Sequence, residues 1–379
     1  MPDFVLNIIV LMRYIFKHGQ CMRQGMARII GKGLAYDDVL ITPKYNKVRS
    51  RKDVAFRTRV TRNYFIDIPL IAANMDTVCE SCMAISIGKL GGLGVIHRFM
   101  SVEDQAKEVA KVKKEGILCA AAVGVKDYES RVKALVSAGV DILVLDVAHG
   151  HSKLVGSVLE WIKKNFKVDV MAGNIATKDA ADYFISKGAD AIKVGIGPGS
   201  LCTTRLMTGA GVPQITAVMD AYEATQGRIP ICADGSIKQP GDVVKAIGAG
   251  ADSVMLGSVF SGTDEAPGEI IIKNGRKYKK FRGMASYEAA LRKQEIDGKK
   301  EEIISVEGES TFVECKGPVG DIVKKFLGGL ASGMTYLGAD SIDKMRGKAD
   351  FIEITQSGMN ESMPHLIAGK NKEDIKNSN

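Results

Sequence analysis

The stretch AIKVGIGPGSLCTTR, residues 191–205, joins a short apolar run to a loop of glycine, proline and small polar residues. Because the run is apolar on both faces, it is typical of a buried strand in a parallel sheet. The same unit recurs at residues 67–74, 92–98, 118–125, 141–147, 169–175, 191–197, 230–236 and 253–259. Helical patterns separate several of these runs, at residues 101–115, 127–138, 153–165 and 178–187. Eight strands that alternate with helices predict an α/β fold, a (β/α)₈ TIM barrel, and the count argues against a doubly wound sheet.

The loops that follow these strands are rich in glycine and polar residues. They are found at residues 74–76, 97–99, 146–152, 173–177, 195–204, 233–236 and 257–265. In a TIM barrel the active site is built from the loops at the carboxyl ends of the strands. We therefore expect the functional site at this end of the barrel.

The repeat breaks after the eighth strand. Residues 261–320 are rich in lysine and glutamate and lack a strong period. Such a stretch is either a disordered linker or, in an enzyme, a mobile flap over the site. Periodicity returns over residues 320–339, which we expect to form the last helix of the barrel.

The domain prediction is a single catalytic barrel, residues 31–365, that includes the flap. It has an N-terminal extension, residues 1–30, and a polar tail, residues 366–379. The apolar start of the chain predicts a surface helix, because it is too short to cross a bilayer. The natural start is either Met1 or Met26.

Composition limits the partners. The chain has 379 residues, and 52 basic against 44 acidic residues give a net charge of +8. The basic residues are scattered, which favours an anionic small molecule over nucleic acid as the partner. Seven cysteines without framework spacing, and no long apolar segment, predict a cytoplasmic protein with free thiols and no membrane partner. Cys79 and Cys82 lack the further ligands of a zinc site, so we expect them to be small residues at a helix start.

The loop at residues 195–204 has the chemistry of a binding site. Its glycines leave backbone N–H groups unshielded, which suits a phosphate or the carbonyl cage of a monovalent cation. By position alone, Cys202 is either a nucleophile or a packed side chain. His149 and His151 have no third ligand at metal spacing, so we expect them to line the pocket or to satisfy local hydrogen bonds.

Many short motifs together resemble the IMP dehydrogenase/GMP reductase family, from about residue 33 to about residue 365. They include LAYDDVLITP, ANMDTV, GGLGVIHR, DVAHGHS, AGNIAT, GIGPGSLCTTR, FRGMAS and LGGLASGMTYLGA. The resemblance implies a homotetrameric barrel in which Cys202 adds to C2 of a purine mononucleotide, with Thr204 and Glu307 as further catalytic residues. It also implies a nicotinamide cofactor, NADPH or alternatively NAD, and a potassium ion.

The resemblance also assigns binding residues. Phosphate would be held by Ser200, Gly235, Ser236, Gly257 and Ser258, and the ribose by Asp234. Further substrate contacts are expected at Gly283, Met284 and Gly308. The cofactor would lie near Asp146, His149, Asn174 and Gly195, and the carbonyls of Gly197, Gly199 and Cys202 would cage potassium.

Two family activities compete for this chain, and we expect GMP reductase. Dehydrogenases of the family usually carry a regulatory domain pair, yet residues 108–123 run straight between two barrel elements. The dehydrogenases resemble one another in an Arg-Tyr pair that activates water, and residues 287–306 contain none. Residues 306–317 are similar to reductases, in which the glutamate at Glu307 works with Thr204 to protonate the departing amine. The motifs GVPQITAV, GTDEAPGE and NESMPH are closer to dehydrogenases, so IMP dehydrogenase is the alternative, and a non-catalytic nucleotide-binding regulator is the third.

Overall fold

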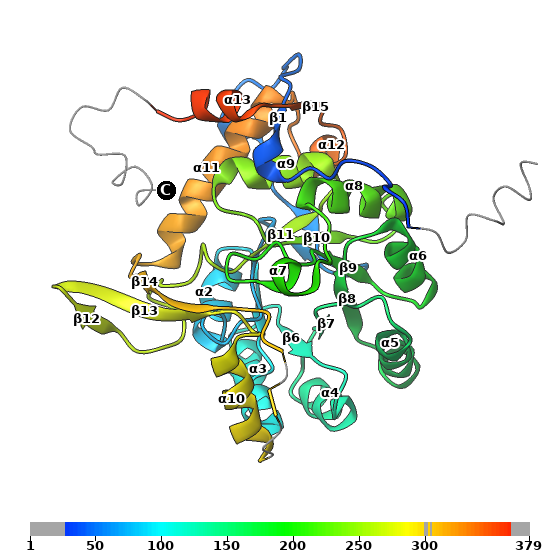
Figure 1. Cartoon of the computed structure of the whole chain (residues 1–379), viewed down its shortest axis with the longest axis vertical. Helices are drawn as coiled ribbons and strands as arrows, with labels where there is room; N and C mark the ends of the chain where they lie inside the picture. Colours follow the sequence, from blue (N-terminus) through cyan, green and yellow to red (C-terminus); the bar gives the residue numbers. More distant parts are fainter. Residues whose placement is uncertain (1–26, 299–301, 304, 365–379) are drawn as a thin grey trace, which may run out of the picture. The chain divides into compact units, whose positions relative to one another are not determined.

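A computed structural model of the chain describes residues 27–298, 302–303 and 305–364. Its centre is a closed barrel of eight parallel strands, which confirms the predicted fold (Figure 1). In barrel order the strands are β10 (Ile231–Asp234), β11 (Ser253–Leu256), β4 (Leu70–Ala72), β5 (Leu93–Ile96), β6 (Ala120–Val123), β7 (Ile142–Asp146), β8 (Asp169–Ile175) and β9 (Ala191–Val194). Each of the eight predicted apolar runs contains one of them.

Two apolar clusters explain why these strands read as apolar on both faces. Successive residues of a strand point to opposite faces. In β4, Ile71 belongs to a cluster with side chains from all eight strands, which fills the barrel interior. Leu70 and Ala72 belong to the larger cluster shared with the surrounding helices. Burial on both faces removes the polar alternation that marks a half-exposed strand.

The helices surround the barrel. They are α2 (Ser81–Lys89), α3 (Val102–Lys114), α4 (Tyr128–Ser137), α5 (Lys153–Asn165), α6 (Lys178–Ser186), α8 (Gln214–Thr225), α9 (Pro240–Ala249) and α11 (Val319–Tyr336). The four helices expected from periodicity are confirmed, and α11 is the expected last helix, because it packs against α9 and α2. Ser101 and Ser152 begin α3 and α5 by accepting hydrogen bonds from N–H groups of the first turn.

A hairpin of β2 (Thr58–Arg59) and β3 (Phe65–Ile66) covers the end of the barrel where the strands begin. Thr61 Oγ1 donates to Asp169 at the start of β8, and Ile66 belongs to the interior cluster. A second pair joins β1 (Val39–Ile41) to β15 (Phe351–Glu353). The smaller helices are η1 (Tyr36–Asp38), η2 (Arg51–Asp53), α7 (Thr204–Thr208), α12 (Ile342–Met345) and α13 (Gln356–Glu361).

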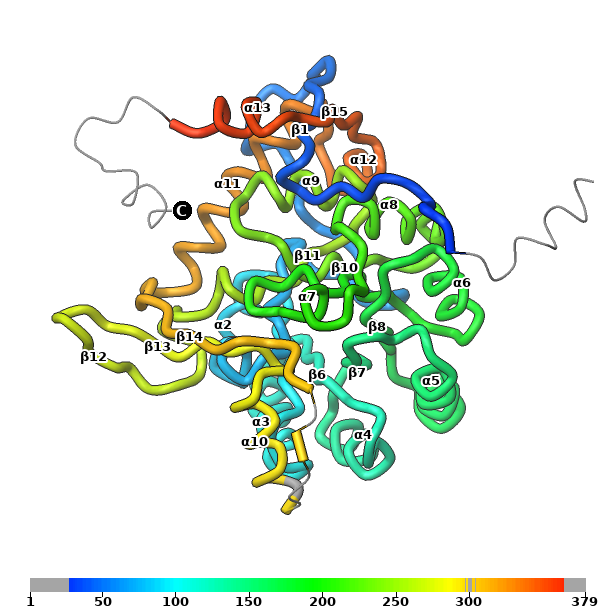
Figure 2. Tube along the Cα trace, viewed as in Figure 1, coloured from blue at the N-terminus to red at the C-terminus, as the bar shows by residue number. Residues whose placement is uncertain are grey.

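The described flap is a folded element. Three antiparallel strands, β12 (Ile271–Lys273), β13 (Arg276–Arg282) and β14 (Ser310–Glu314), form a sheet, and α10 (Tyr287–Asp297) lies between β13 and β14 in the sequence. For this part of the chain the linker alternative is wrong. In Figure 2 the yellow-to-orange flap runs beside the green loop that carries α7.

The sequence of β13 does not show the alternation of apolar and polar residues that marks a strand, because a lysine occupies one of its buried positions. Lys279 is only 5% exposed, and its Nζ donates to the carbonyls of Thr263, Asp264 and Ala266 at 2.9, 3.1 and 2.6 Å. Hydrogen bonds to these three carbonyls replace those that the ammonium would make with water. A hydropathy pattern scores such a position as solvent-exposed.

Residues 27–33 have no regular structure and belong to a unit separate from the one that begins at Leu34. The predicted N-terminal helix and the whole of the predicted polar tail, residues 366–379, lie outside the described residues. None of the helices in the described part of the chain is long and apolar enough to cross a membrane.

Candidate active site

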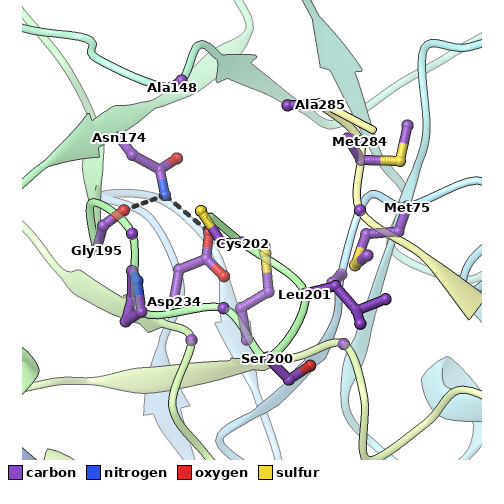
Figure 3. Close-up of a pocket in the computed structure, with 18 of the residues that line it drawn as sticks. Met75, Ala148, Asn174, Gly195, Ser200, Leu201, Cys202, Asp234, Met284 and Ala285 are labelled. Atoms are coloured by element: carbon purple, nitrogen blue, oxygen red, sulfur yellow. Dashed lines mark hydrogen bonds between the residues drawn. The ribbon is translucent and has the colours of Figure 1, made fainter. Parts of the chain in front are cut away.

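A cavity of about 280 Å³ opens where the barrel strands end, as expected. It is lined by residues near or just after the carboxyl ends of β4, β5, β7, β8, β9, β10 and β11, together with residues of the flap. The predicted site residues that line it are Asp146, Asn174, Gly195, Gly197, Gly199, Ser200, Cys202, Thr204, Asp234, Gly235, Ser236, Gly257, Ser258, Gly283, Met284 and Glu307. Figure 3 shows Cys202 inside this ring of residues, with Asn174, Gly195 and Asp234 on one side and Met75 and Met284 on the other.

The loop after β9 needs its glycines to place Cys202. Gly197 has φ +76°, a conformation that L-residues with side chains rarely adopt. Gly235 has φ +101°, and a Cβ there would lie 2.7 Å from Pro198 Cγ. The two loops therefore pack backbone to backbone, and the hydroxyl of Ser236 donates to the Pro198 carbonyl at 2.9 Å.

Cys202, Thr204 and Glu307 form one hydrogen-bonded chain. The Cys202 thiol donates to Thr204 Oγ1 at 3.1 Å, and the Thr204 hydroxyl donates to Glu307 Oε2 at 2.7 Å. Backbone bonds hold the flap to the loop, because Thr203 N donates to Glu307 O and Glu309 N donates to Leu201 O, both at 2.9 Å. A thiol, a hydroxyl and a carboxylate in this order provide a path for a proton between the sulfur and the carboxylate.

The opposite wall carries a second polar cluster. Asn174 Nδ2 donates to Gly195 O at 2.7 Å and to Asp234 Oδ2 at 2.9 Å. Asp146 lies beside this cluster and pairs with Arg98, whose Nε is 3.3 Å from Asp146 Oδ2. Burial acts to raise the pKa of Asp146, but the charges of Lys193 and Arg98 outweigh it and lower that pKa. Asp146 is therefore an ionised hydrogen-bond acceptor at neutral pH.

The residues expected to bind phosphate gather in one part of the cavity. Ser200, Gly235, Ser236, Gly257 and Ser258 all line it. They belong to the loops after β9, β10 and β11, which are neighbours in the barrel. Backbone N–H groups and hydroxyls are the donors that suit a phosphate.

Two predicted site residues do not line the cavity. His149 is exposed, and its ring stacks edge-on with that of His151 at 6.5 Å between centroids. Gly308 instead pairs its backbone with Cys202 and Ser286, which fixes the flap against the loop. Within residues 27–298, 302–303 and 305–364, His, Cys, Asp and Glu side chains form no group of three or more that could hold a metal ion.

Sequence reasoning missed several lining residues, above all Lys193 and Arg98. Lys193 lies in the middle of β9 and is 2% exposed. The sequence contains a signal for Lys193, namely a charged residue inside a strand that is otherwise apolar on both faces. Such a residue must have a buried partner. Its partners come from other strands, so the sequence alone does not identify them.

A buried ion pair anchors the flap to the barrel. Arg282 at the end of β13 donates from Nε to Asp76 Oδ2 at 2.9 Å and Oδ1 at 3.2 Å, and its Nη2 also contacts Oδ2. The Asp76 side chain has no exposed surface, and that of Arg282 is 11% exposed. Removing one partner of such a pair leaves the other charge buried without compensation.

Arg282→Met is therefore expected to lower the free energy of unfolding by about 3–5 kcal/mol, measured by urea denaturation. Arg276→Met on the same strand is the control, because Arg276 and its partner Glu314 are 68% and 57% exposed and 3.8 Å apart. That change should cost at most about 1 kcal/mol. Equal losses in the two variants would show that the Asp76 pair does not anchor the flap.

Comparisons with known proteins agree with this geometry. A family model described as the IMP dehydrogenase / GMP reductase domain matches residues 33–365. GMP reductase from Leishmania donovani is 35% identical over 486 residues, covering 91% of this chain and 99% of the relative. Inosine-5′-monophosphate dehydrogenase from Borreliella burgdorferi is 41% identical over 398 residues, covering 90% of this chain and 98% of the relative. A cysteine-to-alanine variant of GMP reductase from Trypanosoma brucei, solved with guanosine 5′-monophosphate, superimposes with a TM-score of 0.84 at 34% identity, covering 89% of this chain and 99% of that structure.

The lengths of these alignments bear on one argument from the sequence. The match to the Leishmania reductase extends over 486 residues, more than the 379 of this chain, so that relative contains a segment that this chain lacks. The match to the Borreliella dehydrogenase extends over only 398 residues. Between these two relatives, the absence of an inserted domain pair therefore does not favour a reductase.

Proposed function

The chain belongs to the IMP dehydrogenase/GMP reductase family, and we propose that within it the chain is a GMP reductase, which converts GMP to IMP and ammonia with electrons from NADPH. The observation that carries this proposal is the hydrogen-bonded chain from Cys202 through Thr204 to Glu307. Reductive deamination needs a nucleophile at C2 of the purine and an acid for the leaving amine. This arrangement supplies both at one point of the cavity.

The proton path gives each residue a role. Cys202 forms a bond from sulfur to C2 of GMP, and its proton passes through the Thr204 hydroxyl to the Glu307 carboxylate. Return of that proton along the same path to the exocyclic amine breaks the C2–N bond and releases ammonia. Glu307 is thus the base of the first step and the acid of the second.

The nucleotide is held on two sides of the cysteine. The serines and glycines after β9, β10 and β11 take the phosphate, and the Asp234 carboxylate accepts hydrogen bonds from the ribose hydroxyls. Gly283 and Met284 line the cavity from the flap side. This support orients C2 toward Cys202.

The dinucleotide fits the remaining opening of the cavity. Ala148, Met284 and Ala285 border it with apolar groups that suit a flat ring (Figure 3), and Asp146 and Asn174 add hydrogen-bonding groups. When bound, the dinucleotide would supply the hydride that replaces the amine at C2, and the electrons of the broken C2–S bond would return to the Cys202 sulfur, which regains a proton from water. Asp146, Asn174 and Gly195 would position it.

A potassium ion suits the loop of Cys202. Hard cations bind oxygen donors, and the carbonyls of Gly197, Gly199 and Cys202 would supply them. Gly199 O already accepts from Cys202 N at 3.1 Å, but a carbonyl has a second lone pair. We also propose a cytoplasmic homotetramer, in keeping with the family resemblance and with six free cysteines in the described part.

IMP dehydrogenase is the second candidate, because the dehydrogenases from Borreliella burgdorferi and Cryptosporidium parvum are 41% and 40% identical to this chain, against 35% for the Leishmania donovani reductase. The two activities share the adduct at the cysteine and differ in what leaves C2. Hydrolysis of the adduct needs a group that activates water. The sequence YEAALRKQEIDGKKEEIISV, residues 287–306, contains no Arg-Tyr pair for that role.

A paired assay tests the proposal. Purified protein in potassium chloride is given GMP with NADPH in one cuvette and IMP with NAD in the other, and ammonia is measured in the first. We expect NADPH oxidation with one ammonia released per NADPH, and no NAD reduction. NAD reduction with IMP alone would identify a dehydrogenase instead, and NADPH replaced by NADH in a third cuvette establishes which dinucleotide is used.

A further inference from the structure

Lys193 is a buried cation in the site for which the proposed mechanism has no role. Its neighbours in β9 are fully buried apolar residues, and Lys193 itself is 2% exposed. Burying an ammonium among apolar side chains is expensive unless charges and hydrogen bonds compensate it. The position therefore needs a reason beyond packing.

The Lys193 ammonium joins three side chains. Its Nζ donates to Asp234 Oδ2 at 2.7 Å and to Asn174 Oδ1, and it lies 3.7 Å from Asp146 Oδ1. An ammonium has donors only, so it fixes which end of the Asn174 amide faces it. The amide nitrogen is then directed to Asp234 Oδ2 and Gly195 O.

The charges of this cluster balance. Asp146 has two cations beside it, Arg98 at 3.3 Å and Lys193. For Asp234, the ion pair that the structure shows is with Lys193. Burial acts to lower the pKa of Lys193, but the carboxylates of Asp234 and Asp146 outweigh it and raise that pKa, so the ammonium stays charged at neutral pH.

Loss of that charge would change Asp234 most. A carboxylate in a partly buried pocket without a cation takes up a proton more readily. A protonated carboxyl loses acceptor capacity toward ribose hydroxyls, because one of its oxygens becomes a donor. Nucleotide affinity would then gain a pH dependence in addition to that of the nucleotide phosphate.

We propose that Lys193 is a positioning residue that keeps Asp234 ionised and aimed at the nucleotide ribose, and that joins it to Asp146 and Asn174 on the dinucleotide side. This rests on the proposed function, because it takes the bound ligand to be a purine mononucleotide. Lys193 acts through Asp234 and Asn174 and has no contact with the reacting atoms in this scheme. The Lys193 ammonium thereby contacts both the residue that binds the nucleotide ribose and the residues on the dinucleotide side.

The test is equilibrium binding of GMP by calorimetry between pH 5.5 and 8.5 for the wild type and Lys193→Met. The ratio of the two dissociation constants at each pH removes the titration of the GMP phosphate, which both proteins share. We expect the variant to bind more weakly, with a ratio of dissociation constants that grows as the pH falls toward 5.5, because a carboxylate that has lost its paired cation is protonated more readily. Lys193→Arg keeps the charge and should restore a ratio that does not vary with pH.

Lys245→Met is the matched control, because Lys245 is another buried lysine, 8% exposed, that donates to the Tyr36 carbonyl at 2.8 Å away from the cavity. It should lower stability and leave the pH profile of GMP binding unchanged. If Lys193→Met fails to fold, it is made in the Asp234→Asn background, where we expect no further pH dependence.

Two results would overturn the role of Lys193. One is a ratio that is constant with pH although the wild type binds GMP. The other is a pH dependence that Lys193→Arg leaves as large as Lys193→Met does. Binding of neither GMP nor IMP by the wild type would overturn the proposed function, and this inference with it.

Discussion

Cys202→Ala is expected to lower GMP turnover by more than about 10⁴-fold, because no other group in the proposed scheme can form the bond to C2. The alanine keeps the loop backbone, whose Cys202 N donates to Gly199 O. The dissociation constant for GMP should therefore stay within about threefold of the wild type. Turnover is measured by NADPH oxidation and binding by calorimetry.

Cys315→Ala is the matched control for this change. Cys315 is a free, half-buried thiol like Cys202, but it lies at the end of the flap sheet and does not line the cavity. Its turnover should equal that of the wild type. Turnover that survives in Cys202→Ala would refute the covalent mechanism, and loss of GMP binding would make the thiol a structural element of the loop.

Glu307→Gln is expected to lower kcat by about 10²–10⁴-fold, the contribution of a positioned acid or base. The glutamine keeps an oxygen that accepts from the Thr204 hydroxyl, but it cannot take up the proton. GMP affinity should change little, because in the proposed scheme Glu307 transfers a proton, whereas other loops hold the phosphate and the ribose. Ammonia release in a single turnover gives the rate of the affected step.

The control for Glu307 is Glu309→Gln, two residues along the same flap segment. Glu309 is exposed and contacts the cysteine loop through its backbone N–H, which the substitution keeps. Its kcat should match the wild type. Equal losses of kcat and GMP affinity in Glu307→Gln would indicate that the residue only positions the flap.

The barrel could be predicted because each strand can be recognised from its own residues. Each is a short run buried on both faces, and that pattern does not depend on which strand becomes its neighbour. The loop after β9 could also be predicted as a binding site. Its evidence is local, because it consists of a cysteine and of glycines that leave backbone N–H groups free. The geometry of the site could not be predicted from local sequence, because the hydrogen bond between Thr204 and Glu307 joins residues 103 positions apart.

The features that the sequence did not reveal are those with distant partners. In the sequence, Lys193 and Arg282 look like ordinary charged residues of a strand. Their buried partners, Asp234 for Lys193 and Asp76 for Arg282, are found only in the folded structure. The flap sheet was missed for a related reason, since Lys279 is buried by three carbonyls rather than by apolar contact. Hydropathy detects burial by apolar side chains and is insensitive to burial by charge compensation.

The thiol and the carboxylate of the proton path belong to different parts of the fold. Cys202 and Thr204 come from a barrel loop, whereas Glu307 comes from the flap and is held there by two backbone bonds across the loop. In the proposed scheme, a molecule whose flap is undocked lacks both the base of the first step and the acid of the second. If the flap docks and undocks more slowly than one turnover, the burst of ammonia in a single turnover would equal the fraction of molecules whose flap is docked.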